Sequence, residues 1–211
     1  MTKKDLQKEV KPFQYIWSDQ HWGHKRILEY SKRPFKDLED MTEQLIANYN
    51  SVVGPNDTCL WLGDCFFCGT EKAKEIMGRL QGKKILVVGN HDRNKSQMLK
   101  LGFDFVVDEM VLGLRGSRAR FSHFPYWPKW YEVLYLKYKK LYSTLRYKDR
   151  RPPRVKGEIL VHGHTHSDKL VNYKNKTICV CVEATEYKPL PIEKLEQAID
   201  KIRQYHKKGS K

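Results

Sequence analysis

The sequence lacks any long apolar run. No stretch of about 18 apolar residues occurs in the chain, which excludes a transmembrane helix. The basic start of the chain is not followed by an apolar segment, so we expect no secretory signal and a cytoplasmic location. Cysteine is scarce as well. Five cysteines, an odd number in no recognisable disulfide pattern, predict free thiols.

Acidic residues are too few to balance the basic ones. The chain has 40 Lys and Arg against 25 Asp and Glu, a net charge of +15. RNA or single-stranded DNA would suit this charge as a partner, although solubility alone accounts for it equally well. A length of 211 residues provides one domain with a full core but not two, so we expect a single domain over 1–211. Protein partners cannot be read from the sequence.

Short apolar runs alternate with helical patterns in the first half of the chain. Strands are expected at 13–18, 58–62 and 83–88, and helices at 37–53, 70–80 (with Thr70 as N-cap) and 93–101. Strand-like runs then follow at 103–107, 110–114, 118–122, 158–161 and 177–182, before an amphipathic helix that contains Ile192, Leu195, Ile199 and Ile202. This order indicates an α/β layered domain, preceded by a polar arm at 1–11.

Polar side chains follow five of the apolar runs. They are Asp19 and His21, then Asp64, then Asn90, then His123, and finally His164 and His166. The carboxyl ends of strands are where layered α/β folds build ligand sites, so we expect these side chains at one edge. Carboxylate, imidazole and amide oxygen suit divalent metals. Each motif alone is weak, but the five in this order predict a metal centre. Glycines before Asp64, Asn90 and His164 would permit tight turns.

This series, D-x-H, G-D, G-N-H-D, H and G-H-x-H, resembles the signature of calcineurin-like metallophosphoesterases. The stretches 18–35 and 176–198 resemble small stand-alone bacterial and phage members. The resemblance implies a four-layered α/β/β/α sandwich and two divalent metals, with Mn²⁺ as first choice and Zn²⁺, Fe, Ni²⁺ or Mg²⁺ as alternatives. Segment 63–69 lacks the arginine of the GDxxDRG motif of Ser/Thr protein phosphatases, which argues against that activity.

Carried over by motif, the resemblance also implies a role for each residue. One metal would lie on Asp19, His21 and His166, the second on Asn90, His123 and His164, with Asp64 bridging both. His91 would donate a proton to the leaving oxygen, and Asp92 would orient His91. Asn90, His24 and Arg93 are candidates to contact substrate, although a surface position suits His24 as well.

A basic aromatic segment precedes the last metal motif. Residues 124–156 contain ten Lys and Arg, two acids and nine aromatics, a net charge of +8. Helical spacing predicts a helix packed on the domain through Trp127, Trp130, Leu134, Tyr138, Leu141 and Leu145. This insert, with Arg150, Arg151 and Arg154, would form a cap that attracts phosphate-rich substrate and stacks its bases. A solvated helix with core aromatics explains the same residues.

We therefore predict a binuclear phosphoesterase that hydrolyses phosphodiesters or phosphomonoesters by a metal-bridging hydroxide, with nucleotides or nucleic-acid ends as substrates. The alternative is a small-molecule phosphatase without nucleic-acid binding. A binding protein with a degenerate metal site is a third reading, which the complete ligand set opposes. Cys65 and Cys68, or Cys179 and Cys181, could form a structural zinc site or redox pair, but their apolar surroundings favour buried thiols.

Overall fold

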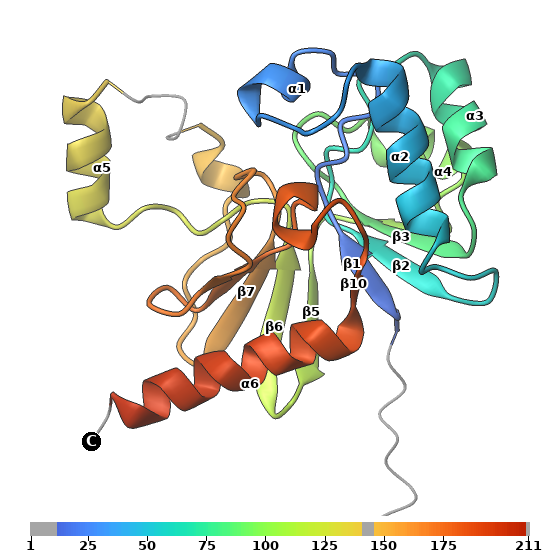
Figure 1. Ribbon diagram of the computed structural model, residues 1–211. Helices are drawn as coiled ribbons and strands as arrows, with labels where there is room; N and C mark the ends of the chain where they lie inside the picture. Colours follow the sequence, from blue (N-terminus) through green and yellow to red (C-terminus); the bar gives the residue numbers. More distant parts are fainter. Residues whose placement is uncertain (1–11, 141–145, 210–211) are drawn as a thin grey trace, which may run out of the picture.

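Strands and helices alternate along the computed structural model, which describes residues 12–140 and 146–209 (Figure 1). The strands are β1 (Tyr15–Trp17), β2 (Thr58–Trp61), β3 (Lys83–Val87), β4 (Phe105–Val107), β5 (Met110–Leu114), β6 (Ser117–Ser122), β7 (Glu158–His162), β8 (Val171–Asn172), β9 (Thr177–Cys179) and β10 (Leu190–Pro191). The α-helices are α1 (Ile27–Tyr30), α2 (Leu38–Asn50), α3 (Thr70–Arg79), α4 (Lys95–Lys100), α5 (Trp130–Tyr138) and α6 (Ile192–Lys208). Two 3-10 helices, η2 (Lys148–Arg150) and η3 (Val182–Thr185), complete the set. The predicted arm at 1–11 lies outside the described residues.

The strands form two five-stranded sheets. The first sheet has the order β10-β1-β2-β3-β4, and the second has the order β5-β6-β7-β9-β8. Strands β1 to β4 run parallel, as do β6, β7 and β9, while β10, β5 and β8 pair antiparallel at the sheet edges. The carboxyl ends of the central strands of each sheet therefore lie at one edge of that sheet.

Alternation along the strands explains why the two sheets stack. In β1, Ile16 faces the core between the sheets, whereas Trp17 faces the helices, and Leu60 and Trp61 of β2 repeat this division. Helices α2, α3 and α4 cover the outer face of the first sheet, where Trp17, Trp22 and Trp61 pack with ring centroids 5.3–5.6 Å apart. The buried face of α6 packs on the core between the sheets. The predicted α/β class is thus confirmed.

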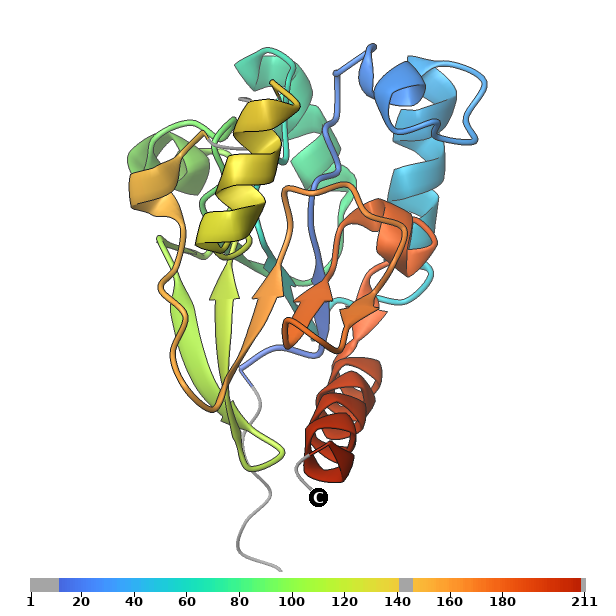
Figure 2. The same cartoon turned by 90° about the vertical axis from the view of Figure 1, so that its left-hand side faces the viewer.

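Residues 124–140 and 146–156 lie on the outer side of the second sheet. Figure 2 shows α5 standing over this face, near the upper ends of the strands. The predicted packing of this helix is wrong: Leu134 is 58% exposed and Tyr138 is 80% exposed. Val133 and Leu136 are the half-buried positions instead. Helical spacing identifies residues on one face of a helix, but it does not determine which face is covered. Leu141 and Leu145 lie outside the described residues.

Two smaller predictions also need correction. Gly69, and not Thr70, is the residue before the first turn of α3. The strand expected at 177–182 ends at Cys179, and η3 begins at Val182. Strands β8 and β10 were not predicted, because two residues are too few for a periodic pattern to appear.

Candidate metal centre

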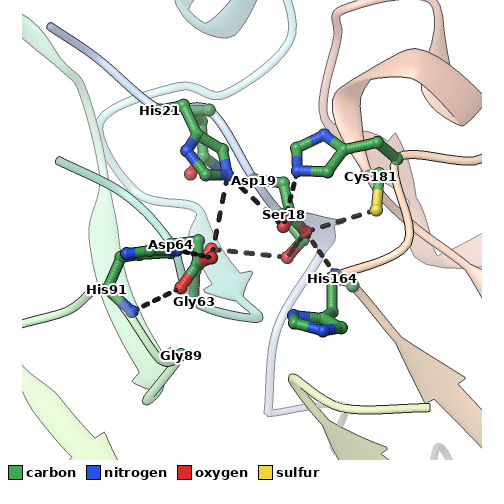
Figure 3. Close-up of polar contacts among 12 residues, drawn as sticks. Ser18, Asp19, His21, Gly63, Asp64, Gly89, His91, His164 and Cys181 are labelled. Atoms are coloured by element: carbon green, nitrogen blue, oxygen red, sulfur yellow. Dashed lines mark hydrogen bonds and ion pairs between the residues drawn. The ribbon is translucent and has the colours of Figure 1, made fainter. Parts of the chain in front are cut away.

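The predicted metal ligands all follow strand ends, and the packing of the two sheets brings them together. Asp19 follows β1 and Asp64 follows β2 in the first sheet; His123 follows β6 and His164 follows β7 in the second. Figure 3 shows Asp19, His21, Asp64 and His164 around one space. Parallel neighbouring strands have their carboxyl ends at the same edge of a sheet, and for this reason the side chains that follow these strands lie close together.

The ligand atoms form two triads. Asp19, His21 and His166 make one, and Asp64, His123 and His164 make the other, with the ligand atoms of each triad within 4.8 Å of one another. Asp64 is also close to the first triad, since its Oδ2 lies 3.7 Å from His21 Nε2 while its Oδ1 lies 3.5 Å from His123 Nε2. The two triads are consistent with a binuclear metal site. The triads contain the residues predicted to hold each metal, apart from Asn90. Asn90 is an amide, whereas these groups consist of acids and histidines alone.

Asn90 lies beside the second triad. Its Oδ1 lies 3.0 Å from His123 Nε2, and His164 Nδ1 lies 3.1 Å from the same atom. His123 Nδ1 is 2.7 Å from the carbonyl oxygen of Leu62, so Nδ1 donates, and in the neutral form that metal ligation requires Nε2 is the acceptor. Lone pairs of His123 and Asn90 thus face each other, and a cation between them would satisfy both.

The carboxylate of Asp19 is held so that one oxygen is left for a ligand. Its Oδ2 accepts hydrogen bonds from Ser18 Oγ at 2.5 Å, from the backbone N–H of His164 at 2.9 Å and from Cys181 Sγ at 3.3 Å. Its Oδ1, like both ring nitrogens of His21, is buried and has no hydrogen-bond partner among the described residues. Buried polar atoms are nearly always paired, so this group fits a metal ion.

Glycines allow the loops that carry Asp64 and His164 to lie close to neighbouring parts of the chain. Gly63 has φ +85°, and a Cβ there would clash with the backbone of Gly89. A Cβ on Gly163 would clash with the side chains of Ser18 and Asp19. The predicted need for glycine before Asp64 and His164 therefore has a steric cause.

Two residues of the centre were missed from the sequence, Glu183 and Arg33. Glu183 Oε1 lies 3.0 Å from His166 Nδ1, which leaves His166 Nε2 facing Asp19 Oδ1 at 3.6 Å. Arg33 is buried and donates to Glu183, to the carbonyl of Asp19 and to that of Gln20 at 2.7–2.8 Å. Glu183 follows the last apolar run, so the strand-end rule that identified the other ligands could have found it.

Burial lowers the pKa of two of the triad histidines. It lowers the pKa of His21 to about 4 and the pKa of His164 to about 3. Burial also lowers the pKa of His166, but its hydrogen bond to the Glu183 carboxylate and the charge of Asp19 offset this and leave that pKa raised. Burial raises the pKa of Asp64 to about 6. Metal ligation requires neutral imidazoles, which His21 and His164 supply at neutral pH.

His91 lies beside the triads and belongs to neither of them. Its side chain is 45% exposed, and its Nε2 lies 3.9 Å from Asp64 Oδ2. The ring packs on Phe67 with centroids 4.5 Å apart. Phe67 also stacks with His21 at 4.8 Å and with His24 at 4.3 Å, so His24 lies at the wall of the site.

The expected contact between Asp92 and His91 is not formed. Both oxygens of Asp92 accept backbone hydrogen bonds, from the N–H groups of Asp64, Cys65 and Gly89 at 2.8–2.9 Å. Asp92 therefore fixes the turn that carries Asp64 instead of orienting His91. Arg93 donates to the carbonyl of Cys68 at 2.6 Å, which supports the same loop.

The three arginines of the insert have different surroundings. Arg150 donates to the carbonyl of Gly89 at 3.2 Å and lies over the ring of Phe124, whose centroid is 5.1 Å from that of His164. Arg151 donates to backbone carbonyls of the insert. Arg154 is exposed and lies over the ring of Tyr126. Of the three, Arg150 contacts the turn that precedes Asn90.

All five cysteines are free, and burial raises the pKa of Cys65, Cys68 and Cys181. No cysteine belongs to a group able to hold a metal among residues 12–140 and 146–209. In the same residues no helix is long and apolar enough to cross a membrane.

No protein-family model matches the chain. The chain resembles the solved structure of a protein of unknown function, AQ665 from Aquifex aeolicus, with a TM-score of 0.63, 28% identity, and coverage of 88% of this chain and 98% of that one. A novel archaeal phosphodiesterase aligns with a TM-score of 0.39 and 16% identity over 79% of this chain and 81% of that one, a likeness too weak to bear on activity. The uncharacterized protein MJ1445 of Methanocaldococcus jannaschii is 30% identical over 194 residues, 89% of this chain and 91% of the relative. The chain therefore belongs to the same family as MJ1445.

Proposed function

We propose that the chain is a binuclear metallophosphoesterase that hydrolyses phosphate esters, phosphodiesters first among them. The observation that carries this proposal is the pair of triads that meet at Asp64, with unpartnered buried atoms directed between the ligands. The order of the motifs, which resembles calcineurin-like metallophosphoesterases, supports the same activity. Two bound divalent ions would supply a water of lowered pKa and neutralise charge on the phosphate. The N and O donors suit Mn²⁺, Zn²⁺, Fe, Ni²⁺ or Mg²⁺, and Mn²⁺ is our first choice.

The residues around the triads have separate parts in this proposal. His91 is exposed, close to Asp64 and outside both triads, so it can donate a proton to the leaving oxygen; such help typically contributes about 10²–10⁴-fold. Arg150 lies at the Gly89 turn and brings a positive charge to the rim, where it can bind a phosphate oxygen. Phe67 and His24 form the wall on the side of His21 and limit how the substrate enters.

The proposal is tested by hydrolysis of bis(p-nitrophenyl) phosphate and p-nitrophenyl phosphate, with metal content measured on the same protein. We expect up to two divalent ions per chain, faster cleavage of the diester, and no hydrolysis after exhaustive chelation. Cleavage of monoesters alone would favour the small-molecule phosphatase. Full activity of the chelated protein would exclude this mechanism.

Two variants test the assigned parts. Asp64→Ala removes the carboxylate shared by the triads and should lose metal and turnover together. His91→Ala removes no triad member, so it should keep the metals and lose turnover, by about 10²-fold or more with a poor leaving group. If His91→Ala instead loses a metal while turnover per bound pair is unchanged, His91 is a ligand and its assigned role is wrong.

A further inference from the structure

A cleft of about 1000 Å³ lies between α5 and the β8–β9 hairpin. It lies on the outer face of the second sheet, where His162, Thr177 and Cys179 line it. Thr165 and Ser167, the two neighbours of His166 in the sequence, also line it, although none of the triad residues does. The cleft is therefore separate from the metal centre but shares the loop that carries two of its ligands.

Five tyrosines line this cleft. They are Tyr126, Tyr131, Tyr135, Tyr173 and Tyr205. Tyr135 is 59% exposed, Tyr173 37% and Tyr205 53%, so these rings contribute little to a core. They come from three separate elements of the fold, namely α5, the β8–β9 hairpin and α6, and the rings of Tyr173 and Tyr205 lie 5.5 Å apart. Flat aromatic faces that remain accessible on both walls of a cleft suit the stacking of nucleic-acid bases.

The charged residues of the cleft are nearly all positive. Arg151, Arg154, Lys169 and Lys174 line it, and Glu132 is the one acid among its lining residues. The Glu132 carboxylate already accepts the backbone N–H of Lys129 at 2.7 Å, at the start of α5. Arg154 lies over the ring of Tyr126 with its guanidinium carbon 4.6 Å from the centroid, so a cation and an aromatic ring are presented together. Such a lining attracts a phosphate backbone.

We propose that this tyrosine cleft binds single-stranded nucleic acid, with bases stacked on Tyr135 and Tyr173 and phosphates near Lys169 and Lys174. An apolar ligand would not account for the four cations, and a small inorganic anion would not account for the tyrosines or the volume. Nucleic acid uses both features. Its role as substrate rests on the proposed phosphoesterase activity, because a strand in the cleft passes the loop that carries His164 and His166.

The test is a binding titration of the full chain in EDTA, so that no hydrolysis occurs. The probe is a fluorescein-labelled oligothymidylate of about eight nucleotides, with an abasic strand of equal length as its partner probe. We expect the abasic strand to bind about 5- to 100-fold more weakly, because it keeps the phosphates and lacks the bases. An RNA strand of the same length identifies which nucleic acid is preferred.

Matched variants locate the site. Tyr135→Ala and Tyr173→Ala should each weaken binding of the normal strand about 5- to 100-fold and leave the abasic strand unaffected. Tyr138→Ala is the control, since Tyr138 is on the same helix, is 80% exposed and does not line the cleft. Lys174→Gln should reduce the slope of log affinity against log salt concentration by about 1, the amount expected for one lost phosphate contact. Lys83→Gln, in the first sheet, should leave the slope unchanged.

Equal binding of normal and abasic strands, or no effect of either tyrosine variant, would overturn the proposal. Hydrolysis of bis(p-nitrophenyl) phosphate separates this failure from failure of the proposed function. If the ester is cleaved but the cleft binds no strand, the phosphoesterase stands and the cleft proposal falls. If the strand binds through Tyr135 and Tyr173 but the ester is not cleaved, the cleft is a nucleic-acid site and the proposed function falls.

Discussion

Five of the seven predicted metal ligands have a left-handed backbone conformation. The φ angles are +62° at Asp19, +56° at His21, +55° at Asp64, +68° at His164 and +48° at His166. Each such residue costs on the order of 1–3 kcal/mol, and the conformation persists only where the surrounding structure enforces it. Backbone hydrogen bonds from Asp19 to Gly63 and from His21 to Asp64 provide that constraint. The polypeptide thus orients these ligands before any ion binds.

At the same scale, Glu183 controls the orientation of His166. Glu183→Gln keeps an oxygen that can accept from His166 Nδ1 but removes the charge that also pairs with Arg33 at 2.8 Å. We expect metal affinity to fall about 10- to 100-fold, as when other groups that orient metal ligands are changed. Competitive titration against a chelator measures this loss. Glu186→Gln, at an exposed position of the same loop, is the control. Unchanged affinity in Glu183→Gln would refute the assigned role.

At the scale of elements, the strand ends explain why so much of the site was readable from the sequence. Asp19, Asp64 and His123 are recognisable because each follows an apolar run, and parallel strands bring such positions to one edge. Glu183 follows the same rule but stands outside any motif. Asp92 was misjudged because sequence proximity to His91 does not indicate which backbone groups its carboxylate meets after folding.

The insert was the least predictable element, for a different reason. The spacing of its apolar residues Trp127, Leu134 and Tyr138 predicts a helix face, and nothing in that spacing tells whether the face meets the domain or solvent. The cleft between α5 and β8 depends on a two-residue strand and on Tyr205 of α6, far apart in the sequence. Only the fold brings these residues together.

Arg151 connects the two ends of the insert. Its guanidinium donates to the carbonyls of Arg146, Pro125 and Tyr126 at 3.2–3.4 Å, and burial lowers its pKa. We expect Arg151→Gln to loosen this segment, so that chymotrypsin cleaves within 124–156 several-fold faster while the rest of the chain is protected. Arg154→Gln should not have this effect, because Arg154 is exposed and contacts a ring instead of the backbone. Equal cleavage rates in the two variants would mean that the hydrogen bonds of Arg151 do not hold this segment in place.

At the scale of the whole molecule, each triad draws its ligands from both sheets. Asp19 and His21 follow β1 of the first sheet, while His166 follows β7 of the second; Asp64 follows β2, while His123 and His164 follow β6 and β7. Each bound ion would therefore join the two sheets. A ligand that binds only the folded state stabilises it, so we expect the metals to add to the free energy of unfolding. Without metal, the same edge contains several buried ionisable groups.

These groups should make the stability of the metal-free protein depend on pH. Burial lowers the pKa of His21 and of His162 to about 4 and that of His164 to about 3, against about 6.5 in the unfolded chain. Between pH 4 and 6.5 the unfolded chain therefore binds more protons, and the free energy of unfolding rises with pH. Asp64 opposes this, because burial raises its pKa to about 6 and the folded state then holds an extra proton between about pH 4 and 6. His166, whose pKa is raised, also opposes the rise, whereas His24, whose pKa burial lowers, adds to it, so the groups with lowered pKa outnumber the opposing ones and leave a net rise.

A difference of one to two protons corresponds to a slope of about 1.4–2.7 kcal/mol per pH unit. Urea unfolding of the chelated protein at pH 5 and pH 6.5 measures it. His162→Asn offers a matched test, because His162 is buried and ligates no metal in either triad, and its Nδ1 donates to the carbonyl of Gly163 at 2.8 Å, as an asparagine amide could. This variant should lower the slope by up to about 1.4 kcal/mol per pH unit, since one buried histidine no longer takes up a proton on unfolding. A stability that is flat or falls between these pH values would mean that the buried histidines do not govern the acid response of the molecule.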